Sequence, residues 1–254
     1  RVYNPFDILL FISVGKMYKN YWFETGTPSF LINIIRNNNY FVPKLNNIEE
    51  EESIINSFDI EDLNLETIMF QAGYLTILEV IQKRNRFSYI LDFPNLEVRL
   101  SFYSHILNYF SDHTQKLKIE DDLYDILKQA NLQNLESVIK RLFSSIAYNN
   151  FTKNDIANYE GFYASVLYAY FASLGLELIA EDITNKGRID LTLKLDNKVY
   201  IFEFKVTKED ALQQIKDKKY YEKYISKDIE VYIIGIVFDS NERNVCEFEW
   251  ERMN

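Results

Sequence analysis

Residues 188–205 read RIDLTLKLDNKVYIFEFK, two strand-like runs on either side of Asp196–Asn197. β-Branched, leucine and aromatic residues dominate both runs, and an aspartate–asparagine pair between them is typical of a two-residue hairpin turn. Counted outward from that turn, the pairing sets Asp190 opposite Glu203. Residues directly opposite each other share one face of a sheet, with Cβ atoms about 4.5–5.5 Å apart. The sequence therefore predicts two carboxylates side by side on one hairpin.

Two carboxylates in this position repel each other, which is unfavourable in a bare scaffold. A divalent cation such as Mg²⁺ or Mn²⁺ removes the conflict, because it binds carboxylate oxygens together with water and substrate phosphate. Lys205 lies two residues beyond Glu203 and therefore shares its face. An ammonium group there would hold an attacking water or stabilise charge on a phosphate. The alternative is that Asp190 and Glu203 are solvent-facing strand charges paired with lysines.

The residues around this hairpin predict a mixed α/β domain. Apolar side chains recur at three- and four-residue steps from 155 to 174, which indicates a helix that ends before Gly175. The run at 230–238 is apolar on both faces, as expected of a central strand. The full predicted order is a helix at 155–174, strands at 177–183, 188–195 and 198–206, a helix at 208–225, the central strand at 230–238 and an edge strand at 245–250.

Short motifs in this region carry a family resemblance. GRID at 187–190, followed after twelve residues by EFK at 203–205, resembles the PD-(D/E)xK nuclease pattern. QQIK at 213–216 and KYYEKY at 219–224 are similar to the helix after this motif in a bacterial subfamily, whose nuclease domain is fused behind an AAA-ATPase-like domain. NYWFETGTPSFL at 20–31 is similar to the end of that ATPase-like domain. The resemblance covers nearly the whole chain, and the middle matches least distinctly.

The resemblance implies a restriction-endonuclease-like αβββαβ core that hydrolyses phosphodiester bonds of nucleic acid with the help of Mg²⁺ or Mn²⁺. It implies that Asp190 and Glu203 are metal ligands and that Lys205 is the catalytic lysine. Glu160 matches an acidic residue that many members use as a further ligand for metal or water. Gln214 matches a polar position on the following helix that contacts the site or the nucleic-acid backbone.

Two of these roles have plain alternatives, and one position departs from the pattern. Glu160 is also explained by the favourable interaction of an acidic side chain with a helix N-terminus. Gln214 is also explained as a surface glutamine. Ile189 stands before Asp190 where the family name places a proline, but members of this superfamily often lack that proline, so its loss does not indicate inactivity.

The charge balance limits how the chain could meet nucleic acid. The 254 residues carry 28 basic and 38 acidic side chains, a net charge of −10. This argues against a broad nucleic-acid-coating surface, but not against an enzyme that uses a local basic patch and a metal. Between residues 205 and 227, seven lysines outnumber four acids. Lys216, Lys219, Tyr220 and Lys223 are therefore candidate contacts to nucleic acid, unless the tyrosines lie in the core and the lysines in water.

Other classes of site find less support. No GxxxxGK[ST] motif occurs, so we expect no P-loop ATP site in this chain. His105 and His113 lack the further Cys or His ligands that a structural zinc site needs. The single Cys246 cannot form an internal disulfide, which favours a reducing, cytoplasmic compartment. No run of about 18 uncharged apolar residues predicts a membrane span, so no membrane partner is expected.

We expect three segments: a helical remnant of the ATPase-like domain at 1–45, a helical connector at 46–150 and the nuclease-like domain at 151–254. Because the chain begins at Arg1, we interpret it as a fragment whose upstream ATPase-like part is missing. Four consecutive glutamates at 49–52 are interpreted as a solvated loop or helix start. Candidate strands at 87–91 and 98–102 flank a turn at 92–95, and residues 121–148 are expected to form one helical segment.

The favoured function is that of a metal-dependent nuclease, with DNA favoured over RNA as the substrate. The alternative is a catalytically inactive nuclease-like module that binds or regulates within a mobile-element, toxin or defence system. The oligomeric state and any sequence preference do not follow from the residues.

Overall fold

The computed structural model describes residues 5–17, 21, 28–38, 40–51, 64–84, 86–111, 113–147, 159–206 and 210–254. Its internal contacts divide the chain into two compact units, Arg1–Ile106 and Leu107–Asn254, which are described separately. Within the described ranges, no helix is both long and apolar enough to cross a membrane. The unit boundary differs from the one predicted near residue 150. Of the helices upstream of that point, the one at 132–145 packs on the C-terminal sheet, and the one at 113–129 packs on that helix.

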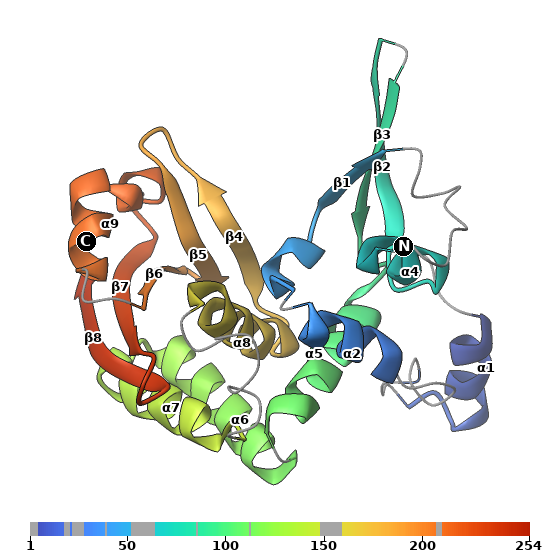
Figure 1. Ribbon diagram of the computed structural model, residues 1–254, viewed down its shortest axis with the longest axis horizontal. Coiled ribbons are helices and arrows are strands. Elements are labelled where there is room, and N and C mark those ends of the chain that lie inside the picture. The colour runs from blue at the N-terminus through green and yellow to red at the C-terminus, as the bar shows by residue number, and fades with distance from the viewer. Residues whose placement is uncertain are drawn as a thin grey trace. The chain divides into compact units, whose positions relative to one another are not determined.

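The N-terminal unit combines helices with a small sheet (Figure 1). The described residues of the first segment contain two helices and a 3₁₀ turn, in agreement with its predicted helical character. Most of the stretch at 20–31, which resembles the end of an ATPase-like domain, lies outside the described residues. The elements of this unit are α1 (Pro5–Ser13), α2 (Ser29–Asn37), η1 (Val42–Leu45), β1 (Ile48–Glu51), α4 (Leu65–Gln71), β2 (Thr76–Lys83), β3 (Arg86–Asp92) and the first part of α5 (Leu96–Phe110).

The glutamate run is a strand and not the expected loop or helix start. β1 contains Glu49–Glu51 and pairs antiparallel with β3, in a sheet of order β1-β3-β2. Ser88 Oγ donates a hydrogen bond to Glu49 Oε1 at 2.8 Å across the two strands. Pairing with a preformed partner strand thus overrides the weak strand propensity of glutamate.

The strand predicted at 87–91 forms as β3, but the prediction of its hairpin partner at 98–102 is wrong. The strands of the hairpin are β2 and β3, whereas residues 98–102 belong to helix α5. The turn-forming segment before α5 acts as a helix start, because Asn95 Oδ1 accepts the backbone N–H of Val98 at 3.0 Å. An asparagine side chain in this position satisfies one of the free donors at a helix N-terminus.

The C-terminal unit is a mixed α/β domain built on one five-stranded sheet (Figure 1). The sheet order is β4-β5-β6-β7-β8, with β6 and β7 parallel and all other neighbours antiparallel. This agrees with the predicted restriction-endonuclease-like core, including the central β7 and the edge strand β8. Its elements are α6 (His113–Gln129), α7 (Leu132–Ser145), α8 (Glu160–Ser173), β4 (Glu177–Ile183), β5 (Arg188–Leu195), β6 (Lys198–Lys205), α9 (Ala211–Lys218), η4 (Tyr220–Lys223), β7 (Glu230–Asp239) and β8 (Asn244–Arg252).

Two predicted helices are shorter or broken because single residues adopt a left-handed backbone. Ala130, at φ 54°, separates α6 from α7 within the predicted span 121–148. Lys219, at φ 51°, ends α9 and leaves a 3₁₀ turn where one continuous helix was expected. Neither residue type favours this conformation, so the sequence offered no sign of the breaks. Residues 155–158 of the predicted first helix lie outside the described residues.

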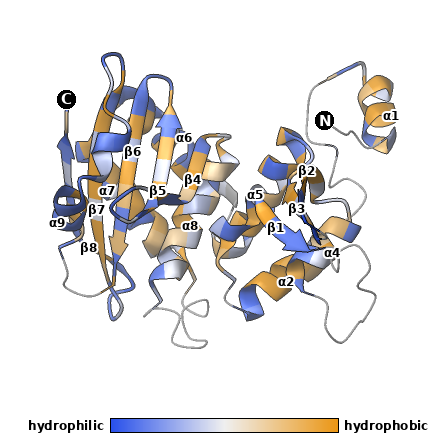
Figure 2. Cartoon of the chain, turned by 90° about the horizontal axis from the view of Figure 1, so that it is seen from above, coloured by the Kyte–Doolittle hydropathy of each residue, from blue (hydrophilic) through white to orange (hydrophobic). Residues whose placement is uncertain are grey.

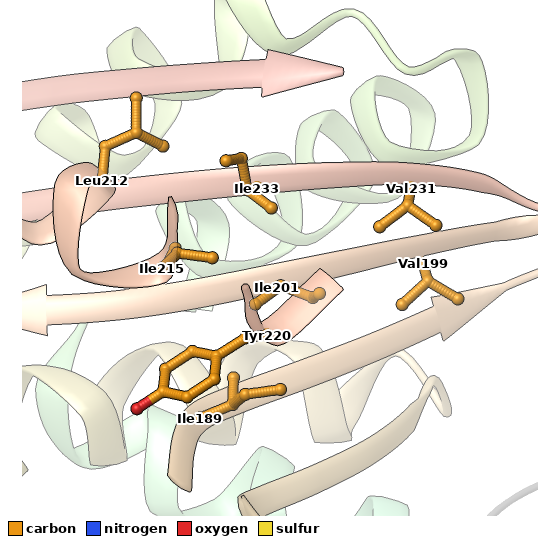
Figure 3. Close-up of a cluster of buried hydrophobic side chains, with 8 residues drawn as sticks. All are labelled: Ile189, Val199, Ile201, Leu212, Ile215, Tyr220, Val231 and Ile233. Atoms are coloured by element: carbon orange, nitrogen blue, oxygen red, sulfur yellow. The ribbon is translucent and has the colours of Figure 1, made fainter. Parts of the chain in front are cut away.

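Side chains alternate along β6, so that its two faces pack against different helices. Phe202 packs against Phe171 of α8, with ring centroids 5.6 Å apart. Ile201 instead joins a cluster on the α9 face (Figure 3). The hydrophobic colour of β6 and β7 in Figure 2 reflects burial of both faces. The cluster consists of Ile189, Val199, Ile201, Leu212, Ile215, Tyr220, Val231 and Ile233.

Gly235 allows α9 to lie directly on the sheet. A Cβ atom at Gly235 would lie 2.4 Å from the backbone N of Leu212 and 2.9 Å from its Cα. These are backbone atoms, so no side-chain rotation could relieve the clash. In the parallel ladder Gly235 is the neighbour of Glu203. Because Gly235 has no side chain, the start of α9 lies against β7 at the position next to Glu203, a predicted site residue.

Gly235→Ala should destabilise the protein by about 1–3 kcal/mol, because the added methyl group overpacks the contact with α9. Chemical denaturation of the variant and the wild type measures the difference. Gly161→Ala is a control, since the three atoms nearest to a Cβ there belong to the exposed side chain of Tyr159 and not to backbone. Equal stability of Gly235→Ala and wild type would contradict the close approach.

Candidate active site

The β5–β6 hairpin has the predicted register. Leu191 pairs with Phe202, and the ladder continues without interruption to Leu195 and Lys198 beside the turn. Asp196 at the turn has φ 53°, the positive value that the two-residue hairpin turns require at their first central position. The alternation of side chains and the local turn chemistry are sufficient to set this pairing.

The ladder stops one step before the predicted pair of Asp190 and Glu203. At that point the carboxylate of Asp190 enters the space between the strands, where its Oδ2 accepts the backbone N–H of Phe204 at 2.8 Å. The side chain thus replaces a ladder carbonyl as acceptor. This bond holds Asp190 against β6. The predicted direct pairing of Asp190 with Glu203 is not part of the ladder.

Glu203 lies at the centre of the site. Its side chain is 1% exposed. Its Oε1 accepts a hydrogen bond from Lys205 Nζ at 3.0 Å and another from Gln214 Nε2 of α9. Its Oε2 is buried and has no hydrogen-bond partner among the described residues. A buried carboxylate oxygen without a donor is costly, so the arrangement favours a ligand that supplies positive charge.

The two carboxylates lie within each other's electrostatic field. Burial raises the pKa of Glu203 to about 8, with a further contribution from the charge of Asp190 and partial compensation by Lys205. Burial also raises the pKa of Asp190, against the opposing effects of the Phe204 N–H and Lys205. This is the like-charge conflict that the sequence predicts.

Lys205 remains an ammonium group despite its partial burial. Burial lowers its pKa, but the charge and hydrogen bond of Glu203, together with the charges of Glu160 and Asp190, outweigh this effect and leave the pKa raised. Its side chain is 13% exposed. A charged amine therefore faces the carboxylate pair from within the protein.

Glu160 is the first residue of α8, and its charge raises the pKa of both Glu203 and Lys205. Among the described residues, however, no group of three or more His, Cys, Asp or Glu side chains has the geometry to hold a metal ion. Asp190, Glu203 and Glu160 are thus not gathered into a three-ligand set. The two carboxylates of Asp190 and Glu203, with Oε2 of Glu203 free to accept a ligand, still fit a cation such as Mg²⁺. Such a cation binds one or two carboxylates and completes its coordination shell with water and phosphate.

Tyr220 supports the site from η4, a role that the sequence did not indicate. Its hydroxyl interacts by hydrogen bonds with the side chain of Gln214 and the backbone of Arg188, which lower its pKa against the larger raising effect of burial. A Cβ atom at Gly187, whose φ is 154°, would lie 2.6 Å from this hydroxyl. The glycine of the GRID motif therefore leaves room for Tyr220.

The candidate nucleic-acid contacts divide into engaged and available side chains. Tyr220 is 3% exposed and lies in the core cluster (Figure 3), so its ring has no free face for stacking on a base. Lys216 binds Glu251, and Lys223 binds the buried Asp182. Lys219, 54% exposed, lies 3.9 Å from Glu222 and beside a hollow of about 400 Å³.

Asp182 ties the segment that contains Lys223 to the sheet. Its carboxylate is 3% exposed and accepts hydrogen bonds from Thr192 Oγ1 at 2.8 Å and from the hydroxyl of Tyr224. Lys223 also donates to the carbonyl of Ile183 at 3.0 Å. Lys223 and Tyr224 are thus structural, and the sequence could not distinguish them from exposed residues of a basic helix.

Comparison with known proteins agrees with the fold of this unit. Residues 158–248 match the family model of the PD-(D/E)XK nuclease superfamily. A protein of Azotobacter chroococcum mcd 1, described as an uncharacterized protein in the vnfD 5′ region, is 38% identical over 257 residues. The match covers 99% of this chain and 50% of that protein, so the chain spans about half the length of its relative. No solved structure matches.

Without metal, Glu203 should make the folded protein less stable as the pH rises. Its folded-state pKa of about 8 exceeds the ordinary value of 4.5, so its contribution to stability is complete below about pH 4.5 and is lost as the pH rises through about 8. Glu203→Gln should remove this dependence and melt at a higher temperature than the wild type above about pH 8. Thermal melts in a chelator across this range provide the measurement, and parallel curves for the two proteins would contradict the raised pKa.

Proposed function

We propose that the C-terminal domain is a metal-dependent nuclease that hydrolyses phosphodiester bonds of nucleic acid. The observation that carries the proposal is the buried carboxylate of Glu203. One of its oxygens accepts hydrogen bonds from Lys205 and Gln214, and the other has no hydrogen-bond partner among the described residues. The charge of Asp190 also raises the pKa of Glu203. The PD-(D/E)XK superfamily match of residues 158–248 supports this reading of the cluster.

Asp190 and Glu203 would hold Mg²⁺ or Mn²⁺, with Glu160 as a further acidic group nearby. When bound, the cation would polarise the phosphate and lower the pKa of a coordinated water. Lys205 orients the attacking water and stabilises the charge that develops on the phosphate oxygens. Gln214 fixes the orientation of Glu203 through its hydrogen bond to Oε1, and Tyr220 in turn restrains Gln214.

The substrate and the context of the chain are further parts of the proposal. DNA is the favoured substrate. Of the candidate lysines Lys216, Lys219 and Lys223, Lys219 has the longest ion pair, 3.9 Å to Glu222, and is the one most easily released to a phosphate. The similarity of residues 20–31 to the end of an AAA-ATPase-like domain supports a fusion in which such a domain precedes the nuclease in a bacterial, cytoplasmic protein. The curated relative, at twice the length of this chain, leaves room for such a domain.

Mg²⁺ or Mn²⁺ should raise the melting temperature of the wild type, because a ligand that binds only the folded state stabilises it by about 2.7 kcal/mol at a hundredfold excess over its Kd. Glu203→Gln should lose most of this gain. Glu177→Gln is the matched control, since Glu177 is an exposed carboxylate of the same sheet, paired with Lys194. An equal response of all three proteins would mean that the cation binds elsewhere.

Lys205→Ala should lower the rate of cleavage by about 10²-fold or more, because it removes a charge that acts on the transition state. Binding of nucleic acid should change only slightly. Cleavage of labelled DNA and RNA with each metal provides the measurement. Lys194→Ala, at a half-buried lysine of the same sheet that pairs with Glu177, is the control for loss of a lysine outside the site.

A wild type that cleaves no substrate with any metal, yet binds nucleic acid as tightly as Lys205→Ala, would replace this proposal with a binding or regulatory module on a nuclease fold.

A further inference from the structure

The tip of the β2–β3 hairpin is the most basic short segment of the N-terminal unit. Residues 81–88 contain Lys83, Arg84 and Arg86 and no acidic residue, in a chain of net charge −10. All three side chains are exposed. Arg84 lies in the turn, with φ 59°. Within the described part of the chain, no ion pair joins any of the three to a carboxylate. Their charges are therefore available to an external anion.

The two strand residues of this group oppose each other. Lys83 is paired directly with Arg86 in the β2–β3 ladder. Like charges directly opposite on an antiparallel pair destabilise the hairpin. An anion placed between them, such as a phosphate, would remove this repulsion. The tip thus shows the same kind of charge conflict as the carboxylate site, with the opposite sign.

The tip is a free two-stranded ribbon. The third strand, β1, pairs with β3 only from Ser88 to Leu91, so the β2–β3 pairs Gln82–Phe87 and Lys83–Arg86 lie beyond the three-stranded part (Figure 1). A two-stranded ribbon has the right dimensions for the major groove of B-form DNA, which is about 12 Å wide. A single strand of nucleic acid would be better matched by an open sheet face or an aromatic groove.

The two faces of the ribbon differ in a way that suits a groove. Lys83 and Arg86 share one face, and the other carries Gln82 opposite Phe87, with Val80 two positions along. Phe87 is 41% and Val80 54% exposed. Cationic side chains reach phosphates, whereas glutamine amides bond base edges and apolar side chains contact the thymine methyl group.

We propose that the β2–β3 tip binds double-stranded DNA, with the ribbon in the major groove and Lys83, Arg84 and Arg86 on the flanking phosphates. The inference rests on the proposed nuclease function for the choice of DNA as partner, and it adds an anchoring surface outside the nuclease domain. Such a contact is compatible with the net negative charge of the chain, because it depends on three local cations and not on the whole surface.

The experiment measures binding of a labelled DNA duplex by fluorescence anisotropy at several salt concentrations, with the full chain carrying Lys205→Ala so that no cleavage occurs. Replacement of Lys83, Arg84 and Arg86 by Gln should weaken binding at least tenfold and flatten the log–log salt dependence by roughly 2–3 units, about 0.9 per lost phosphate contact. The matched control replaces three exposed lysines elsewhere, Lys44, Lys118 and Lys128, by Gln. It should change the slope little.

Each contrary result would overturn the inference. Equal effects of the two triple variants would show a non-specific charge effect. Loss of binding to anionic phospholipid vesicles, with duplex binding unchanged, would assign the tip to a lipid surface. Absence of measurable duplex binding by the parent protein would also contradict it.

The outcome is distinguishable from a failure of the nuclease proposal. Weaker duplex binding by the tip variant, together with no cleavage by the wild type, would retain the anchoring surface and remove the enzyme. Unchanged duplex binding by the tip variant, together with normal cleavage by the wild type, would retain the nuclease and remove the anchoring surface.

Discussion

The hydrogen bonds to Glu203 are the interaction on which the C-terminal domain depends. A carboxylate at the centre of a buried sheet is tolerated only if donors surround it, and here Lys205 from its own strand and Gln214 from α9 supply them. Gln214 reaches Glu203 because α9 lies against Gly235, and it is held there by Tyr220. The packing of α9 and the electrostatics of the site therefore depend on each other. Both depend on two glycines: Gly235 leaves room for α9, and Gly187 leaves room for Tyr220.

The parts of this arrangement that the sequence predicts are those decided by neighbouring residues. The β5–β6 register follows from strand alternation and a two-residue turn, and it places Asp190 and Glu203 on neighbouring strands beyond the last paired residues, Leu191 and Phe202. The position of β7 in the sheet follows from a run that is apolar on both faces. The superfamily match of residues 158–248 is consistent with the motif that these strands carry.

The parts that the sequence does not predict depend on distant partners. The entry of Asp190 between the strands follows from where the β5–β6 ladder ends, and no local pattern marks that point. Tyr220 looks like one more tyrosine in a lysine-rich helix, since the left-handed Lys219 that turns it inward has no compositional sign. Glutamates 49–51 form a strand only because β3 is available to pair with them. In each case a tertiary contact outweighs the local preference.

The edge position of β8 has a consequence for the behaviour of the protein in concentrated solution. One side of this strand is unpaired in the described sheet, which is the kind of surface on which a second chain could add a strand. Glu247, Glu249 and Glu251 are exposed along it at every second residue. Two such edges brought together would align like charges, so the strand resists self-association. These three glutamates of the acidic chain thus oppose pairing of β8 with a second copy, a role separate from that of the carboxylates near Lys205.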